Sequence, residues 1–103
     1  MSVQETFNQF GGGRAMLMIG GQAIDAGGEH LLVMFKAKAK NRANRVSIKL
    51  EASDTYTVEF WYERSYAHTT RSIHSNVYAD QLRELFERET GLYLSLGTMA
   101  VQS

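Results

Sequence analysis

The segment TYTVEFWYE, residues 55–63, carries the strongest β-strand pattern in the chain. Seven of its nine residues are β-branched or aromatic, and such residues favour strands. Because side chains alternate between the two faces of a strand, one face is apolar and aromatic throughout: Tyr56, Val58, Phe60 and Tyr62. This face has to be buried, so the rest of the chain must supply neighbouring strands and a cover.

The chain has 103 residues, which predicts one domain, and its 44% hydrophobic and 21% charged residues are typical of a globular domain. The absence of cysteine excludes a disulfide framework, a thiolate zinc site and a cysteine nucleophile, and it fits a reducing cytoplasm. The apolar run at residues 15–19, which no other run exceeds in length, is too short to span a membrane, and the N-terminal segment lacks the pattern of a signal peptide. We therefore expect a cytoplasmic protein with no membrane partner.

Four further segments are expected to form strands: residues 14–19, 30–36, 45–51 and 64–75. The first is a short apolar run, and the last is polar enough to lie at an edge of the sheet. We expect a loop over residues 22–28 and a polar turn over residues 41–44. The short connections between neighbouring strands predict an antiparallel meander.

Two helices are expected to flank this sheet. Ser2 and Glu5 form a capping box, and Phe7 and Phe10 follow at helical spacing, which predicts a helix over residues 2–10 that ends at the glycines 11–13. Residues 79–90 form a second amphipathic pattern that ends at Gly91. The predicted fold class is α+β: a five-stranded antiparallel meander sheet flanked by a short N-terminal and a C-terminal helix. We expect a single domain over residues 1–96 and a disordered tail over residues 97–103.

Six short segments form a succession along the chain: GGGR (11–14), MIG (18–20), VSIKL (46–50), DTYTVEF (54–60), VYADQLR (77–83) and TGLYLSL (90–96). Over roughly residues 5–96, this succession resembles a family of small uncharacterised proteins encoded mostly by bacteriophages and other mobile elements. Residues 77–96 are its most distinctive part, whereas family members usually carry Thr-Gly-Ala where this chain has IGG at residues 19–21. The resemblance implies a phage or prophage gene and the cytoplasm of a bacterial host. Because the family has no established activity, no catalytic residue is carried over.

The sequence lacks the usual signatures of catalysis. The glycines 11–13 precede an expected strand, whereas a dinucleotide-binding motif follows a strand and opens a helix, and no G-x-x-x-x-G-K-[ST] motif occurs. His68 and His74 would lie about 20 Å apart on one strand, too far apart to share a metal ion. The carboxylates of the last helix alternate with arginines, which is typical of a solvated face. We therefore predict a protein that is not an enzyme and has neither a metal site nor a cofactor.

Positive charge is concentrated in the first half of the chain. Residues 1–50 carry seven Lys/Arg and three Asp/Glu, whereas residues 51–103 carry four and eight. Six of the basic residues form the candidate nucleic-acid-binding site: Lys36, Lys38, Lys40, Arg42, Arg45 and Lys49. We expect a hairpin arm whose lysines lie on one face about 7 Å apart, close to the spacing of phosphates along one strand. The alternative is a solvated hairpin whose lysines prevent edge pairing.

The single tryptophan, Trp61, lies on the polar face of the central strand between Glu59 and Glu63. It is expected either to be covered by a helix or to be exposed as an anchor for a protein partner, and these three residues form the candidate protein-binding site. Two functions remain open. The first is a non-enzymatic protein that contacts nucleic acid through its basic hairpin. The second is a protein-binding effector that inhibits or modulates a host or defence protein through its acidic half and Trp61.

Overall fold

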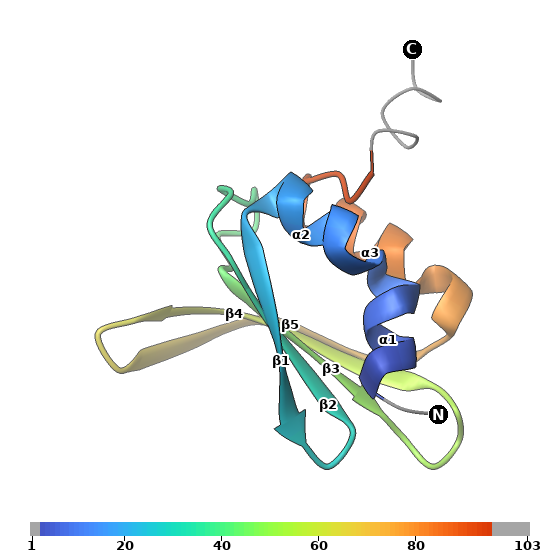
Figure 1. Ribbon diagram of the computed structural model, residues 1–103. Coiled ribbons are helices and arrows are strands. Elements are labelled where there is room, and N and C mark those ends of the chain that lie inside the picture. The colour runs from blue at the N-terminus through green and yellow to red at the C-terminus, as the bar shows by residue number, and fades with distance from the viewer. Residues whose placement is uncertain (1–2, 96–103) are drawn as a thin grey trace.

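The computed structural model describes residues 3–95, and in it one antiparallel sheet is covered by helices on one face (Figure 1). The chain begins with two helices, α1 (Val3–Phe10) and α2 (Gly12–Ile19). Five strands follow: β1 (Gly21–Gly27), β2 (His30–Phe35), β3 (Arg45–Leu50), β4 (Tyr56–Arg64) and β5 (Ala67–Val77). A short 3-10 helix, η1 (Ala79–Gln81), leads into the last helix, α3 (Leu82–Thr90). The helical layer therefore comes from both ends of the chain and the sheet from its middle.

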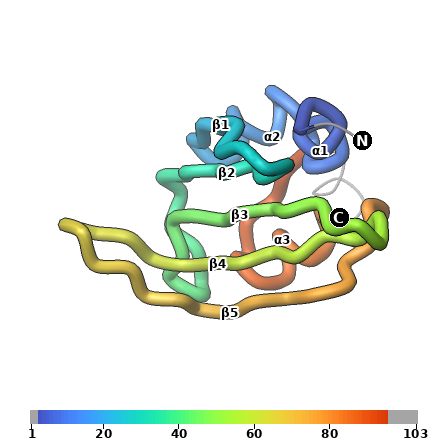
Figure 2. Tube along the Cα trace, turned by 90° about the horizontal axis from the view of Figure 1, so that it is seen from below, coloured from blue at the N-terminus to red at the C-terminus, as the bar shows by residue number. Residues whose placement is uncertain are grey.

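Each strand pairs antiparallel with the next one along the chain, in the order β1-β2-β3-β4-β5 (Figure 2). This arrangement confirms the predicted α+β class and the five-stranded meander. The segment at residues 55–63 is the strand β4, between β3 and β5. Tyr56, Val58 and Phe60 are buried, which confirms the alternation of faces as far as Phe60. The fourth residue of the predicted face, Tyr62, is only half-buried.

Aromatic rings join the helices to the sheet. The ring centroid of Phe86 in α3 lies 5.0 Å from that of Phe10, 5.4 Å from that of Phe35 and 6.0 Å from that of Phe60. The first two contacts are edge-to-face, a geometry that adds to the stabilisation from apolar burial. All four rings are buried. One aromatic core therefore links α1, α3, β2 and β4.

The expectation of a strand over residues 14–19 is wrong, because these residues form most of α2. Ala15 and Ile19 are fully buried, whereas Leu17 between them is 85% exposed. Burial at positions four apart is the pattern of a helix with one face on the core. A short apolar run does not distinguish a strand from a buried helix, and Ala, Met and Leu favour helices. Gly11, with a φ of 127°, is the single residue between α1 and α2. The chain therefore has two N-terminal helices where one was expected.

The expectation of a loop over residues 22–28 is also wrong, because β1 occupies this region. β1 is an edge strand that pairs with β2, with Ala23 opposite Val33 and Asp25 opposite Leu31. Its glycines and alanines have little preference for strands, and pairing with a strongly apolar neighbour outweighs such local preferences. The sheet keeps five strands because β1 replaces the strand that was expected at residues 14–19.

Two sequence predictions lie outside the described residues: the Ser2 part of the capping box and the tail over residues 97–103. Among residues 3–95, no helix is long and apolar enough to cross a membrane.

Candidate functional site

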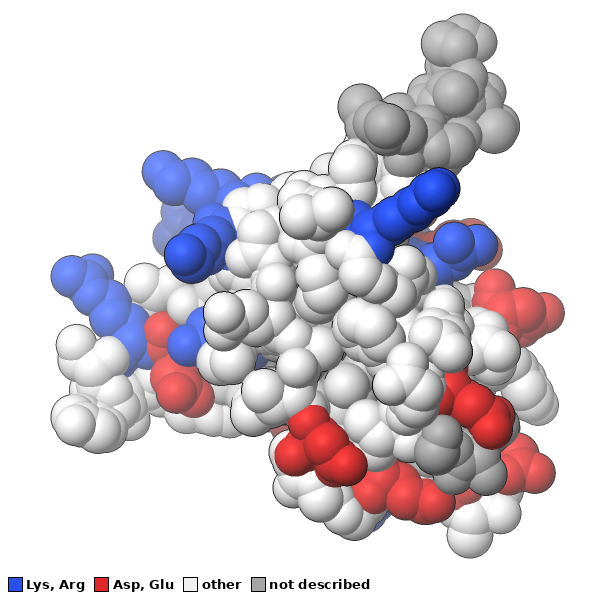
Figure 3. All heavy atoms as spheres, viewed as in Figure 1, with Lys and Arg blue, Asp and Glu red and all other residues white. Residues whose placement is uncertain are grey.

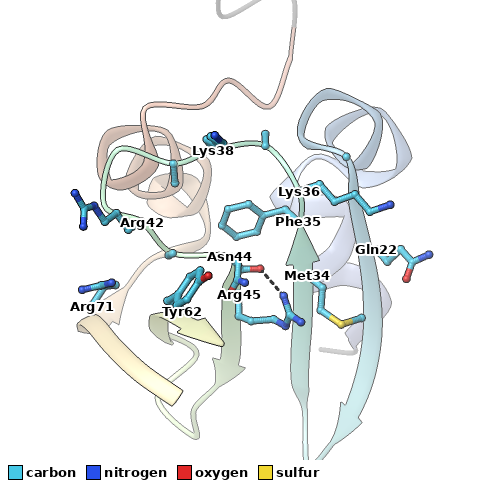
Figure 4. Close-up of a pocket in the computed structure, with 14 residues that line it drawn as sticks. Gln22, Met34, Phe35, Lys36, Lys38, Arg42, Asn44, Arg45, Tyr62 and Arg71 are labelled. Carbon is cyan, nitrogen blue, oxygen red and sulfur yellow. Dashed lines mark hydrogen bonds between the residues drawn. The ribbon is translucent and has the colours of Figure 1, made fainter. Parts of the chain in front are cut away.

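An open groove of about 970 Å³ lies where β2 ends and the chain turns toward β3 (Figure 4). No Asp or Glu of residues 3–95 lines it. Three parts of the chain contribute cationic side chains: the loop at residues 36–44, the start of β3, and β5. We call it the basic groove and define it by Lys36, Lys38, Arg42, Arg45, Arg71 and the ring of Tyr62. Its concentrated positive charge suits an anionic ligand.

The loop at residues 36–44 is held against the ends of two helices. The N–H of Lys36 and the N–H of Ala37 donate to the carbonyl oxygen of Ile19, the last residue of α2, at 3.3 and 3.1 Å. The N–H of Lys40 donates to the carbonyl oxygen of Thr90, the last residue of α3, at 2.8 Å. Helix C-termini carry partial negative charge, which favours nearby lysines. The lysines of the loop are therefore positioned by the helical layer.

Asn44 joins this loop to the sheet. Its side-chain Nδ2 donates to the carbonyl oxygen of Glu63, and its Oδ1 accepts from the N–H of Glu63, both at 2.9 Å. Its backbone N–H donates to the carbonyl oxygen of Trp61 at 3.0 Å, and its carbonyl oxygen accepts from the N–H of Phe35 at 3.1 Å. The side chain of Asn44 thus continues the ladder with β4 beyond the start of β3, and it fixes the groove relative to the β4–β5 hairpin.

Arg71 lines the groove because β5 contains a β-bulge. Phe60 is opposite Ser72 and Trp61 is opposite Thr70, so Arg71 is the extra residue of the bulge. A bulge locally bends a strand and changes the direction of its side chains, and here Arg71 lines the same groove as Tyr62 (Figure 4). Sequence reasoning missed Arg71, because the position of a bulge depends on the pairing of two strands and has no local signal.

Four of the six predicted nucleic-acid-binding residues line the basic groove: Lys36, Lys38, Arg42 and Arg45. The other two do not. Lys40 lies against Gly91 beyond the end of α3, where a Cβ on the glycine would come within 3.3 Å of the lysine Cδ. Lys49 lies toward the far end of β3, with its Nζ 3.8 Å from Oε1 of Glu51. The sequence therefore predicts four of the five cationic residues of the groove, but it also includes two lysines that lie outside it.

The expected hairpin arm over this basic segment is wrong. β2 ends at Phe35, and residues 36–44 form a loop rather than two extended strands. The alternation in the sequence is nevertheless real: the lysines at 36, 38 and 40 are exposed, and the alanines at 37 and 39 are half-buried against the core. The pattern arises because the alanines pack on the core while the loop crosses from α2 to α3.

Opposite charges occupy opposite ends of the sheet. Figure 3 shows most Lys and Arg in the upper and left parts of the view and most Asp and Glu in the lower part, although some acidic side chains lie beside basic ones at the left and right. The turns β1–β2 and β3–β4 lie at the end of the sheet away from the loop at residues 36–44 (Figure 1). We call them the acidic turns and define them by Asp25, Glu29, Glu51 and Asp54. An anion near the molecule is therefore attracted to one end and repelled from the other.

Trp61 lies on the helix-free face of the sheet, yet it is only 8% exposed. The imidazole of His68 stacks on the indole, with ring centroids 4.9 Å apart and an interplanar angle of 11°. The indole N–H donates to Oε1 of Glu63 at 3.1 Å. The Oε2 of Glu59 lies 3.3 Å from Nε2 of His68 and accepts from Oγ1 of Thr70 at 3.1 Å. Neither expectation for Trp61 is met, because a histidine rather than a helix covers the ring and the ring is not exposed as an anchor.

A second polar cluster joins β5 to α3. The hydroxyl of Ser72 donates to Oε1 of Glu89 at 3.1 Å, and Nε2 of His74 lies 3.1 Å from that hydroxyl and 3.2 Å from the same carboxylate oxygen. In a Ser-His-acid triad, the hydroxyl and the acid contact different ring nitrogens. Here one nitrogen contacts both, so this cluster has the geometry of a structural tie between the edge strand and the helix.

Within residues 3–95, no group of three or more His, Asp or Glu residues is placed to hold a metal ion. Comparisons of the chain with protein-family models, with curated proteins and with solved structures find no match. The resemblance to phage-encoded proteins therefore stays a prediction. The proposed function therefore rests on the basic groove.

Proposed function

We propose that the chain is a small non-enzymatic binding protein that holds the backbone of a nucleic acid in the basic groove. One observation carries the proposal. Five cationic side chains from three parts of the chain line the basic groove, and no Asp or Glu of residues 3–95 lines it. None of the five is ion-paired with a carboxylate of residues 3–95. Phosphates would supply the missing negative charge, and binding them would release the counterions that condense on a polynucleotide.

The groove favours a polymer over a small anion. Its volume of about 970 Å³ lies at the upper limit for small-molecule pockets, and it is only partly enclosed. Lys36 and Lys38 supply point charges, while the three arginines offer bidentate contacts to phosphate oxygens. The ring of Tyr62 adds an aromatic surface, and a basic groove with aromatic side chains is typical of proteins that bind single strands.

The resemblance to phage-encoded proteins supports a phage or prophage origin and action in the cytoplasm of a bacterial host. The alternative function, a protein-binding effector that acts through the acidic half and Trp61, has less support, because Trp61 is only 8% exposed.

The salt dependence of binding tests the proposal. A labelled oligonucleotide of about 20 nucleotides is titrated at salt concentrations between about 50 and 200 mM, and log affinity is plotted against log salt. The double variant Lys36→Gln/Lys38→Gln is expected to reduce the magnitude of the slope by about 1.4 units for a single strand, because two phosphate contacts are lost. The fold should be retained, since both side chains are exposed.

The matched control is Lys40→Gln/Lys49→Gln, which removes the same charge from two lysines outside the groove. Its slope is expected to equal that of the wild type. An equal reduction in both double variants would show diffuse attraction rather than a site in the groove. A wild-type protein that binds neither single nor double strands of DNA or RNA at low salt would contradict the proposed function outright.

A further inference from the structure

The β4–β5 hairpin extends beyond the rest of the sheet at the end that carries the basic groove (Figures 1 and 2). β3 begins at Arg45, which is opposite Trp61, so the part of β4 after Trp61 lies beyond the β3 ladder. We call residues 62–71 the arm. Its residues 63–71 are all exposed. Tyr62 and Arg71, at the base of the arm, also line the basic groove, so the arm begins at the groove wall.

The tip of the arm has an unusual residue for its backbone conformation. Arg64 pairs with Ala67, which leaves the two-residue loop Ser65 and Tyr66, with φ of 49° and 70°. A two-residue hairpin loop with two positive φ angles favours Asn-Gly, because most side chains are strained there. A bulky residue with positive φ is uncommon. The side chain of Tyr66 is fully exposed, so it makes no packing contacts with residues 3–95 that would offset this strain.

We infer that Tyr66 is a stacking platform for an unpaired base of the strand whose backbone lies in the basic groove. This inference rests on the proposed function and specifies its ligand as single-stranded DNA or RNA. Tyr66 follows Tyr62 by four positions, the last two in the turn, so the two residues lie no more than about 13 Å apart. A nucleic-acid strand that leaves the groove along the arm therefore reaches the tip. Bases of a single strand are free to stack on an aromatic ring, whereas those of a duplex are already paired and stacked. The exposed Arg64 beside the tip adds positive charge along the same path.

The variant Tyr66→Gly tests the inference, because glycine suits the loop better than tyrosine and lacks the ring. The probes are labelled oligothymidylate, oligouridylate and a DNA duplex of equal length. Affinity for the single strands is expected to fall about 5- to 100-fold, the range for loss of one base–aromatic stack. Affinity for the duplex and the salt slope should stay at their wild-type values, since the phosphate contacts remain. Tyr66→Phe keeps the ring and should retain wild-type affinity. The melting temperature of Tyr66→Gly should not fall, which excludes unfolding as the cause.

Each outcome decides the inference. A loss confined to DNA or to RNA supports it and identifies the polymer. Single-strand binding by Tyr66→Gly that equals wild type overturns it, as does an equal loss for the duplex. If Tyr66→Gly is without effect while Lys36→Gln/Lys38→Gln reduces the slope, the groove function stands and the stacking role falls. If the wild type binds only the duplex, the groove function stands and the stacking role falls. If it binds neither single strands nor the duplex, both fall together.

Discussion

The two ends of the sheet differ in charge, although the chain has a net charge of zero. The basic groove carries five cationic side chains, and the acidic turns at the other end carry four carboxylates. β3, which begins at Arg45 in the groove and ends at Leu50, spans much of the roughly 20 Å between them. The net charge does not reveal this separation of charge. The separation orients an approaching polyanion toward the basic groove.

The two ends also differ in how they are built. The acidic turns are held mainly by local contacts, such as the N–H of Gly27 donating to Oδ1 of Asp25 at 2.9 Å and the N–H of Asp54 donating to the carbonyl oxygen of Glu51 at 3.0 Å. One longer-range bond, from the N–H of Leu50 to the carbonyl oxygen of Glu29 at 3.2 Å, joins the two turns. The groove is held by contacts among α2, α3, β4 and the loop at residues 36–44. An end assembled from distant segments can bring together cations that are separated in the sequence, as Lys36 and Arg71 are. The end that carries the basic groove is therefore the better candidate for a binding site.

Both ends depend on the shared core, so damage to the core should produce the largest effect. Phe60→Ala removes a fully buried ring that contacts Phe86 and is expected to destabilise the fold by about 3–5 kcal/mol. Ile73→Ala, on the neighbouring strand at 60% exposure, should change stability by less than about 0.5 kcal/mol. Chemical denaturation measures both variants. Equal midpoints would show that the faces of β4 and β5 are assigned wrongly.

Charge reversal at the two ends should have unequal effects on binding. Arg71→Glu places a carboxylate in the groove and is expected to weaken single-strand affinity by about tenfold or more at low salt. Lys49→Glu makes the same change outside the groove and should weaken it by less than about threefold, because screening limits charges beyond about 10 Å. Fluorescence anisotropy at matched salt measures both. A larger loss for Lys49→Glu would move the site away from the groove.

Each end of the sheet contains a non-glycine residue with a positive φ. Replacing that residue with glycine should raise stability at both ends but should weaken binding only at the groove. Arg42 in the groove loop and Asp54 in an acidic turn have φ of 65° and 62°. Glycine at either position is expected to raise stability by about 0.5 kcal/mol, because the left-handed strain is removed and part of the gain is lost to unfolded-state entropy. Only Arg42→Gly should weaken nucleic-acid binding. Thermal melts and anisotropy together test this, and reduced binding by Asp54→Gly would contradict it.

Neutralising the acidic turns should produce the smallest effect. The amide variants Asp25→Asn, Glu29→Gln, Glu51→Gln and Asp54→Asn preserve the geometry of acceptors such as Oδ1 of Asp25. Combined, they are expected to raise affinity by less than about threefold at low salt and to have no effect near 0.15 M, where the Debye length is about 8 Å. Anisotropy at the two salt concentrations checks this. A large gain that persists at higher salt would show that the acidic turns lie near the bound polymer.

The sequence predicts the parts of the molecule that local pattern controls. Alternation in the segment at residues 55–63 predicts the core face of β4 as far as Phe60, and the run of basic residues predicts Lys36, Lys38, Arg42 and Arg45. The local sequence pattern does not predict the structure of segments whose conformation is selected by tertiary contacts. The apolar run at residues 14–19 fits a strand or a helix equally well, and packing of Ala15 and Ile19 selects the helix.

The shape of the groove could not be predicted either. It depends on the hydrogen bonds between Asn44 and Glu63, which lie nineteen residues apart, and on the bulge at Arg71. Both are properties of strand register, which a single sequence does not reveal. The same holds for Trp61, whose cover is the imidazole of His68 across the β4–β5 ladder. In each case the missing information is a pairing between segments rather than a preference of one segment.

The most direct test of the basic groove as the binding site is a titration of the isotope-labelled protein with an unlabelled single strand, followed by two-dimensional NMR of the backbone amides. The predicted result is that the largest shift changes fall on the loop at residues 36–44, on Arg45, and on Tyr62 and Arg71, while the acidic turns stay unchanged. Shift changes centred on the acidic turns, or spread evenly over both ends of the sheet, would contradict the assignment of the basic groove as the nucleic-acid site.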